Sequence, residues 1–257
     1  MIATELKPKQ SGTREWAKQT VNCCTGCSHD CLYCYAKLRQ VNYKKVRPED
    51  WHLERIREKD VFKKHKKYPG RVMFPSSHDI SDHNWSACQI VLDNLLKAGN
   101  EVLVVSKPHL TCIGATCALF KDYRDSIIFR FSIGSCDDRI LSFWEPNAPS
   151  YEERKASLKF AFDKGFRTSI SMEPMLDSVN IDALISDLMP YVSDTIWIGK
   201  MNYLGWISRG FNEQQMQMVR KIKEGQTDCA IRKIYSCYQY APKIEWKDSI
   251  KKVVGLV

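Results

Sequence analysis

Three cysteines in one short segment are the residues best suited to chemistry. Cys27, Cys31 and Cys34 form a C-x3-C-x2-C pattern, with Tyr33 directly before the last cysteine. A [4Fe-4S] cluster normally takes four thiolates, so a segment with three leaves one iron free to bind another molecule. A zinc site and three unrelated buried thiols are the alternatives. Zinc sites favour two C-x2-C pairs or a distant histidine pair, and this segment supplies a single C-x2-C, so the spacing favours the cluster.

The composition indicates one globular domain. The chain has 257 residues, of which 44% are hydrophobic, enough for a sizeable core. The opening MIATELKPKQSGTREW has neither an apolar nor an Arg-rich leader pattern, and eighteen apolar residues never run together. An odd count of 11 cysteines in a chain of this length favours reduced thiols over a disulfide framework. We therefore expect a cytoplasmic protein with no membrane span.

The formal charge of +9 arises from 39 Lys and Arg against 30 Asp and Glu. Positive residues concentrate early in the chain, in Lys37–Arg47 and Lys63–Lys67. Such segments can contact phosphate groups, but they can equally be solvated helix faces. Charge alone leaves nucleic-acid contact open.

Apolar, β-rich runs alternate with amphipathic segments along the chain, which predicts a parallel sheet with right-handed crossovers. The expected strands are one near Lys18–Cys23 and then Arg71–Phe74, Glu101–Ser106, Ser126–Ser132, Arg167–Met172 and Thr195–Gly199. The expected helices include Trp85–Ala98, Ser150–Lys164, Ile181–Met189 and Asn212–Lys223.

Polar residues follow each of these expected strands. In a parallel barrel the carboxyl ends of the strands carry the reactive groups, so we expect a binding mouth there. The residues at these positions are Ser76, Ser77, His78 and Asp79; Ser106 and Lys107; Ser132, Ser135, Cys136, Asp137 and Asp138; Ser171, Met172 and Glu173; and Lys200 and Asn202.

The segment TGCSHDCLYCYA, residues 25–36, resembles the radical S-adenosylmethionine (SAM) proteins of the spore photoproduct lyase-like group, whose signature is GC-x-H-x-C-x-YCYA. Further similar segments are VVSKP from Val104, FRFSIGS from Phe129, and the AP-x-x-x-ER helix that opens APSYEERKASLKFAFDKGFRTSISMEPMLD from Ala148. The resemblance covers most of the chain, from about residue 16 to about residue 202.

This resemblance implies an α/β fold, the partial (β/α)6 TIM barrel of radical SAM proteins. A single domain would span residues 1–257, with its core at about 16–202 and a C-terminal helix and tail extension over 203–257. It also implies that a [4Fe-4S] cluster binds SAM through its open iron and splits it reductively. The resulting 5′-deoxyadenosyl radical would take a hydrogen atom from a substrate. The implied partner is a one-electron reductant of the flavodoxin or ferredoxin type, and the oligomeric state stays open.

The resemblance also suggests roles for individual residues. The backbone of Tyr33 would contact adenine, and Ser77, His78 and Asp79 would receive the SAM amino group. Lys107 and Ser132 would hold the SAM carboxylate and nearby atoms, unless Lys107 is simply an exposed strand-end lysine. For Glu173 the alternatives are SAM or substrate contact and a structural hydrogen bond, and we expect His29 to support the loop rather than bind iron.

The chain departs from the lyase at its hydrogen donor. The lyase uses a cysteine after its second strand, whereas this chain has only FPSSHD there, residues 74–79. Topology favours Cys136 as a donor, with Cys23 and Cys24 next. Cys88, Cys112 and Cys117 are expected on helices as buried residues, and Cys229 and Cys237 are too widely spaced to indicate a second cluster.

Three functions remain. The favoured hypothesis is a radical SAM enzyme that modifies or repairs a nucleic acid or nucleotide. The second is the same chemistry on a peptide, protein or small metabolite, because residues such as Tyr235, Tyr238 and Tyr240 could equally belong to a core. The third is a noncatalytic metal-binding module.

Overall fold

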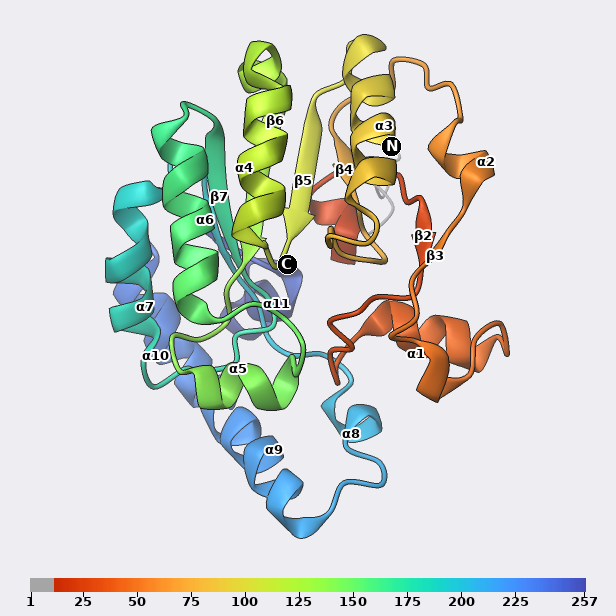
Figure 1. The fold of residues 1–257 in the computed structure, drawn as a ribbon. Helices are drawn as coiled ribbons and strands as arrows, with labels where there is room; N and C mark the ends of the chain where they lie inside the picture. Colours follow the sequence, from red (N-terminus) through yellow and green to blue (C-terminus); the bar gives the residue numbers. More distant parts are fainter. Residues whose placement is uncertain (1–11) are drawn as a thin grey trace, which may run out of the picture.

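The protein is built around a curled parallel sheet, seen in a computed structural model that describes residues 12–257 (Figure 1). Residues 1–11, on which much of the expectation about a leader rests, lie outside the described residues. The seven strands are all parallel and follow one another across the sheet in chain order. They are β1 (Gln19–Thr20), β4 (Val72–Phe74), β5 (Val102–Ser106), β6 (Ile127–Ser132), β7 (Arg167–Met172), β8 (Ile196–Ile198) and β9 (Ile244–Trp246).

Helices cover the convex face of the sheet, as Figure 1 shows for α3, α4 and α6. In α3 the buried residues include Val91, Leu92, Leu95 and Leu96, which recur at helical spacing and face the buried strand residues. The covering helices are α3 (Trp85–Lys97), α4 (Leu110–Leu119), α6 (Tyr151–Asp163), α7 (Ile181–Leu188) and α10 (Asp228–Tyr238). None of the helices described is long and apolar enough to cross a membrane.

A second group of elements lies beyond the carboxyl ends of the strands, in the lower half of Figure 1. It contains α1 (Tyr35–Asn42), α5 (Asp138–Trp144), α8 (Leu204–Ile207) and α9 (Glu213–Gly225). The short antiparallel pair of β2 (Cys24–Thr25) and β3 (Arg55–Ile56) holds the two ends of the α1 segment together. The remaining helices are α2 (Glu58–Val61) and α11 (Asp248–Val254).

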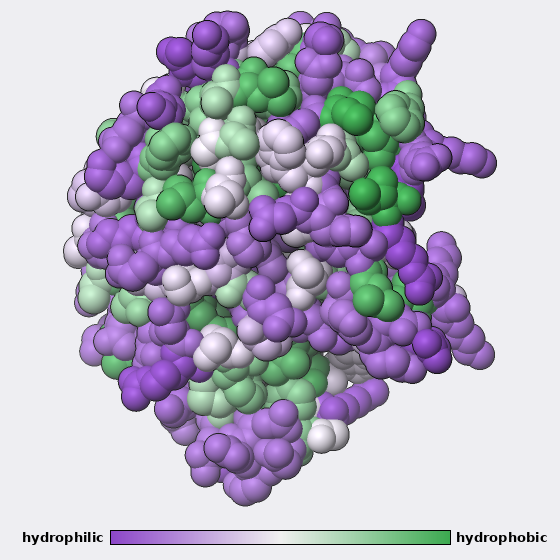
Figure 2. Space-filling model, in the orientation of Figure 1, coloured by the Kyte–Doolittle hydropathy of each residue, from purple (hydrophilic) through white to green (hydrophobic). Residues whose placement is uncertain are grey.

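Apolar side chains gather on the surface over α5 and α9, the green region in the lower part of Figure 2. Between α5 and the segment before α9, the rings of Phe143 and Phe211 lie 6.2 Å apart, and those of Trp144 and Phe211 lie 6.4 Å apart. Edge and tilted contacts of this kind are favourable aromatic geometries. They join α5 to the segment between α8 and α9.

The predicted strands and helices are confirmed to within a few residues, and so is the helix start at Ser150, whose hydroxyl accepts from the Glu153 N–H. The sheet nevertheless has seven strands, one more than expected. The additional strand, β9, lies in the region predicted as a helix and tail extension. It was missed because only two buried residues, Ile244 and Trp246, alternate around exposed Glu245.

Candidate functional site

The cluster loop, residues 26–34, starts directly after β2 at a position that requires glycine. Gly26 has a φ of +91°, and a Cβ there would lie 2.2 Å from a backbone carbonyl oxygen of the segment before β3. The Cys27 N–H donates to the Trp51 carbonyl at 2.9 Å, and the Leu32 N–H donates to the last carbonyl of α5 at 2.9 Å. The loop is therefore fixed from two sides.

The three thiols of the loop are close enough to influence one another. Burial raises the pKa of Cys31 to about 12. Burial also raises the pKa of Cys27, and the neighbouring Asp79, Cys31 and Cys34 raise it further. Within residues 12–257, no three or more His, Cys, Asp or Glu side chains are arranged as a ready metal site. In number and type, however, three thiols from one loop fit a cluster with one open iron, provided that their side chains turn toward a common point.

Asp79, in the segment after β4, links the loop to the strand ends. Its Oδ1 accepts from the Ile80 N–H at 2.8 Å and from the Ser106 hydroxyl. Its Oδ2 accepts from the Lys107 N–H at 2.9 Å and lies 3.3 Å from the Nδ1 of His29. Burial alone would raise the pKa of Asp79, but His29 and the hydrogen bonds outweigh burial and hold it well below its usual range. Both carboxylate oxygens are thus engaged within the protein.

The backbone between β4 and α3 is held by the end of β1. The Oδ1 of Asn22 accepts from the N–H groups of Ser76 and Ser77, at 2.7 and 2.8 Å. His78 is buried, its Nε2 accepts from the Cys23 N–H at 3.1 Å, and its Nδ1 donates to the carbonyl of the next residue at 2.9 Å. Of the three residues predicted for this segment, only Ser77 has a side chain without a hydrogen bond to a described residue.

Lys107 follows β5, and its ammonium stands beside the cluster loop. Its Nζ lies 5.5 Å from the centre of the Tyr33 ring, and it forms neither a hydrogen bond nor an ion pair with any residue described. Burial alone would lower the pKa of Lys107, but Cys31, Tyr33, Glu145 and Asp79 outweigh burial and raise it. A lysine that stays charged without a fixed partner is suited to bind a carboxylate as a point charge.

Two charged residues behind the loop were missed in the sequence. The Tyr33 hydroxyl donates to Glu145, whose Oε2 lies 2.5 Å from the Nη1 of Arg154. Both members of this ion pair are buried, and Arg154 also donates to the Ser132 carbonyl at 3.2 Å. Arg154 is the arginine of the AP-x-x-x-ER motif, which could have identified it. Glu145 has no comparable sequence signal.

Glu173, at the end of β7, takes part in a buried ion network. Its Oε2 lies 3.2 Å from the Nζ of Lys247, which in turn lies 3.0 Å from the Oε1 of Glu15. Burial raises the pKa of Glu173 even though Lys247 opposes the effect. Nearby, the Tyr35 hydroxyl of α1 donates a hydrogen bond to the Ser76 carbonyl, in the segment after β4. If Glu173 has a structural role instead of contacting SAM or substrate, Lys247 is its partner.

Cys136 follows β6 in a different environment. Its pKa is raised by burial first and then by Asp177, with smaller effects from Asp137 and Asp187. Lys107, by contrast, acts directly on Cys31. Contacts group Lys107 and Asp79 with Tyr33 and His29 of the loop, and Cys136 stays a predicted donor.

The other cysteines are mostly buried. Cys23 is fully buried, with its Sγ 3.9 Å from the Sγ of Cys88, and Cys24 is 1% exposed. Cys88, Cys112 and Cys117 lie on α3 and α4 as buried residues, which confirms their expected placement.

Solved structures of spore photoproduct lyase resemble this chain along nearly its whole length. A mutant with bound S-adenosylmethionine and dinucleoside spore photoproduct has a TM-score of 0.55 and 14% identity, covering 95% of this chain and 80% of the lyase chain. A complex with dinucleoside spore photoproduct has a TM-score of 0.57 and 13% identity, with the same coverage. This chain has the fold of spore photoproduct lyase. The predicted partial barrel is thereby confirmed.

Two proteins of similar sequence carry the name of uncharacterized proteins. ORF301 of Acidianus two-tailed virus is 24% identical over 172 residues, which cover 62% of this chain and 56% of the viral protein. MJ0683 of Methanocaldococcus jannaschii is 24% identical over 181 residues, which cover 69% of this chain and 68% of that protein. No protein-family model matches the sequence. The match to ORF301 spans little more than half of the length of that viral protein.

Proposed function

We propose that the chain is a radical SAM enzyme. The observation that carries the proposal is the position of the three-cysteine loop, which lies at the carboxyl edge of a spore photoproduct lyase fold beside the ammonium of Lys107, a cation without an ion pair among residues 12–257. In parallel barrels this edge holds the reactive groups.

The residues around the loop then bind the cluster, bind SAM or position a residue that does. Cys27, Cys31 and Cys34 would hold a [4Fe-4S] cluster, which, when bound with SAM, supplies a radical that removes hydrogen from a substrate. Lys107 binds the SAM carboxylate, and Asp79 fixes the Lys107 backbone through its N–H. The remaining predicted SAM contacts, from the Tyr33 backbone, Ser77, His78, Asp79, Ser132 and Glu173, belong to the same proposal.

The proposed substrate is a nucleic acid or a nucleotide. Spore photoproduct lyase has been solved with a dinucleoside spore photoproduct, and a net charge of +9 favours a polyanion. A peptide, protein or small metabolite is the alternative substrate. A noncatalytic metal module is the alternative function, which predicts zinc in the purified protein and no 5′-deoxyadenosine.

Anaerobic reconstitution with iron, sulfide, SAM and dithionite tests the proposal. We expect an EPR signal that changes on SAM addition, together with formation of 5′-deoxyadenosine. Candidate substrates deuterated at different positions would then be compared, because transfer of deuterium into 5′-deoxyadenosine identifies the attacked carbon. A protein that binds zinc and forms no 5′-deoxyadenosine would refute the proposal.

A further inference from the structure

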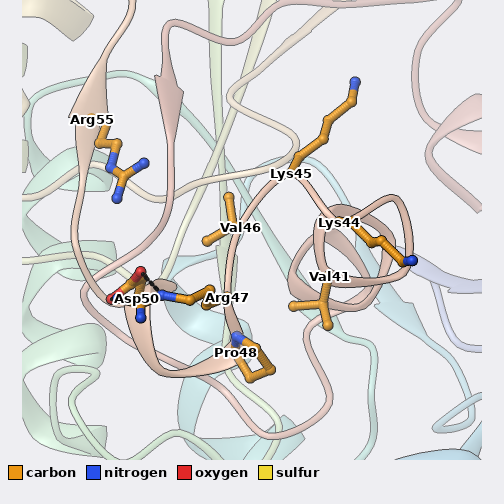
Figure 3. A pocket seen from close by; sticks show the side chains of 8 residues that line it. All are labelled: Val41, Lys44, Lys45, Val46, Arg47, Pro48, Asp50 and Arg55. Carbon is orange, nitrogen blue, oxygen red and sulfur yellow. Dashed lines mark hydrogen bonds and ion pairs between the residues drawn. The ribbon is translucent and has the colours of Figure 1, made fainter.

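A positively charged surface pocket lies on the α1 side of the cluster loop, between the end of α1 and β3 (Figure 3). Its volume is about 410 Å³, and it is broadly open to solvent. Four of its lining residues are cationic, Lys44, Lys45, Arg47 and Arg55, against one carboxylate, Asp50. Nothing in the roles proposed above uses these residues.

Most of the positive charge in this pocket is uncompensated. Arg47 pairs with Asp50, with 2.7 Å between Nε and Oδ2. Lys44, Lys45 and Arg55 are exposed and form no ion pair with any residue between 12 and 257. Three free cations around one depression create a local positive potential that attracts an acidic partner and speeds its association.

The pocket is connected to the thiols through one apolar side chain. Val46 lines the pocket and packs in the same hydrophobic cluster as Cys27, Cys34 and Trp51. Figure 3 shows Val46 between Arg55 and Val41, at the centre of the pocket. A protein docked here would therefore approach the cluster loop from outside, away from Lys107 and the strand ends where SAM and substrate are proposed to bind.

We propose that this pocket is the docking surface for an acidic one-electron carrier protein. The inference rests on the proposed function, since a cluster that cleaves SAM must first be reduced. In the step assigned to this surface, a reduced carrier would give one electron to a cluster held by Cys27, Cys31 and Cys34, with no proton or group transferred. A compact pocket that contacts the thiol loop fits this task better than it fits a polynucleotide track, which would have to reach the strand ends.

The test compares two charge reversals of equal size. Lys45→Glu/Arg55→Glu alters the pocket, and Lys64→Glu/Lys66→Glu alters the other basic segment by the same total charge. Binding of oxidised flavodoxin to each reconstituted protein is measured directly. We expect the pocket variant to bind at least about tenfold more weakly than the wild type at low salt and to depend less on salt, because its attraction to an acidic carrier is lost, and the control variant to bind within about twofold of the wild type.

Activity provides a second readout. With flavodoxin as the electron source, the pocket variant should form 5′-deoxyadenosine more slowly, and with dithionite it should match the wild type. Flavodoxin binding that is absent in the wild type, or unchanged in the pocket variant, would overturn the inference. The inference would also be overturned if the pocket variant kept its flavodoxin binding and lost only its binding to a single-stranded DNA oligonucleotide. If dithionite yields no 5′-deoxyadenosine in the wild type, the proposed function fails, while the binding comparison still decides the docking surface.

Discussion

At the scale of single residues, Lys107 combines a fixed backbone with a side-chain charge that is available to bind a ligand. Its backbone N–H is held by the Oδ2 of Asp79, while its ammonium has neither a hydrogen bond nor an ion pair with a described residue and faces the Tyr33 ring. The Oδ1 of Asp79 also accepts from Ser106 and Ile80, and its Oδ2 lies beside His29, so the carboxylate joins the end of β5 and the segment after β4 to the cluster loop. Asp79 therefore serves as a positioning residue for the cation beside the thiols.

Replacement of Lys107 by Ala should weaken SAM binding and leave the iron content unchanged. A charge-assisted contact contributes about 1.5–3 kcal/mol, so we expect the dissociation constant for SAM to rise by about tenfold or more. Equilibrium binding of SAM to the reconstituted protein measures this, with exposed Lys121→Ala as the matched control. An unchanged SAM affinity in the Lys107 variant would remove this residue from the site.

Replacement of Cys27, Cys31 or Cys34 by Ala should abolish the cluster, because each change leaves only two thiolates. Iron and sulfide analysis and EPR after anaerobic reconstitution provide the measurement. Exposed Cys229→Ala should keep the full iron content. A Cys31→Ala protein that retains a SAM-responsive cluster would contradict the assignment.

Replacement of Cys136 by Ser tests the predicted hydrogen donor. If this thiol returns hydrogen to the product radical, the variant should still form 5′-deoxyadenosine, because that step comes earlier, while the substrate radical goes to abortive products. Product analysis by mass spectrometry, with Cys229→Ser as control, separates the two steps. A normal product yield would exclude Cys136 as the donor.

At the scale of elements, one buried ion pair joins three segments. Glu145 follows α5 and Arg154 lies in α6, and the Tyr33 hydroxyl connects the pair to the cluster loop. Arg154 also donates to the carbonyls of Pro149 and Ser132, at 2.7 and 3.2 Å. Buried charges of this kind are tolerated only when they are paired and hydrogen-bonded. The pair therefore helps to fix the loop's position against the sheet.

Arg154→Met should be strongly destabilising, because it leaves the buried Glu145 carboxylate without its counter-charge. Removing one member of a buried pair costs about 3–5 kcal/mol. Lys155→Met removes the neighbouring, partly exposed pair with Asp187 and should cost at most about 1 kcal/mol. Denaturant unfolding of both variants measures the difference, and equal losses of stability would refute the role of burial.

The sequence predicted these elements unevenly, for physical reasons. Strands such as β7 could be predicted because they are long and mostly buried, whereas β9 has only three residues. The cysteine loop was readable because its ligands lie within eight consecutive residues, 27–34. The Glu145–Arg154 pair and the contact of Asn22 with the loop after β4 were not, because a partner distant in the chain leaves no local periodicity.

At the scale of the whole molecule, the first described residues and the last strand meet inside the curl of the sheet. The Nζ of Lys247, just after β9, pairs with Glu15 and Glu173 and lies 4.2 Å from the centre of the Trp16 ring. The guanidinium carbon of Arg130, on β6, lies 4.9 Å from the same ring. Trp16 thus lies between cations from the middle and the end of the chain. This network includes Glu173, which directly follows β7, and it connects the two ends of the described chain across the concave face of the open sheet.

Lys247→Met tests whether this network holds the molecule together. The variant leaves Glu15 and Glu173 buried without a counter-charge, so we expect a loss of about 3–5 kcal/mol in the free energy of unfolding. Exposed Lys252→Met, on α11, should change it by less than about 0.5 kcal/mol. Hydrogen exchange should also rise in residues 12–17 and in β9 together, because one ammonium contacts both. Faster exchange in only one of these segments would show that the ends of the chain are held independently.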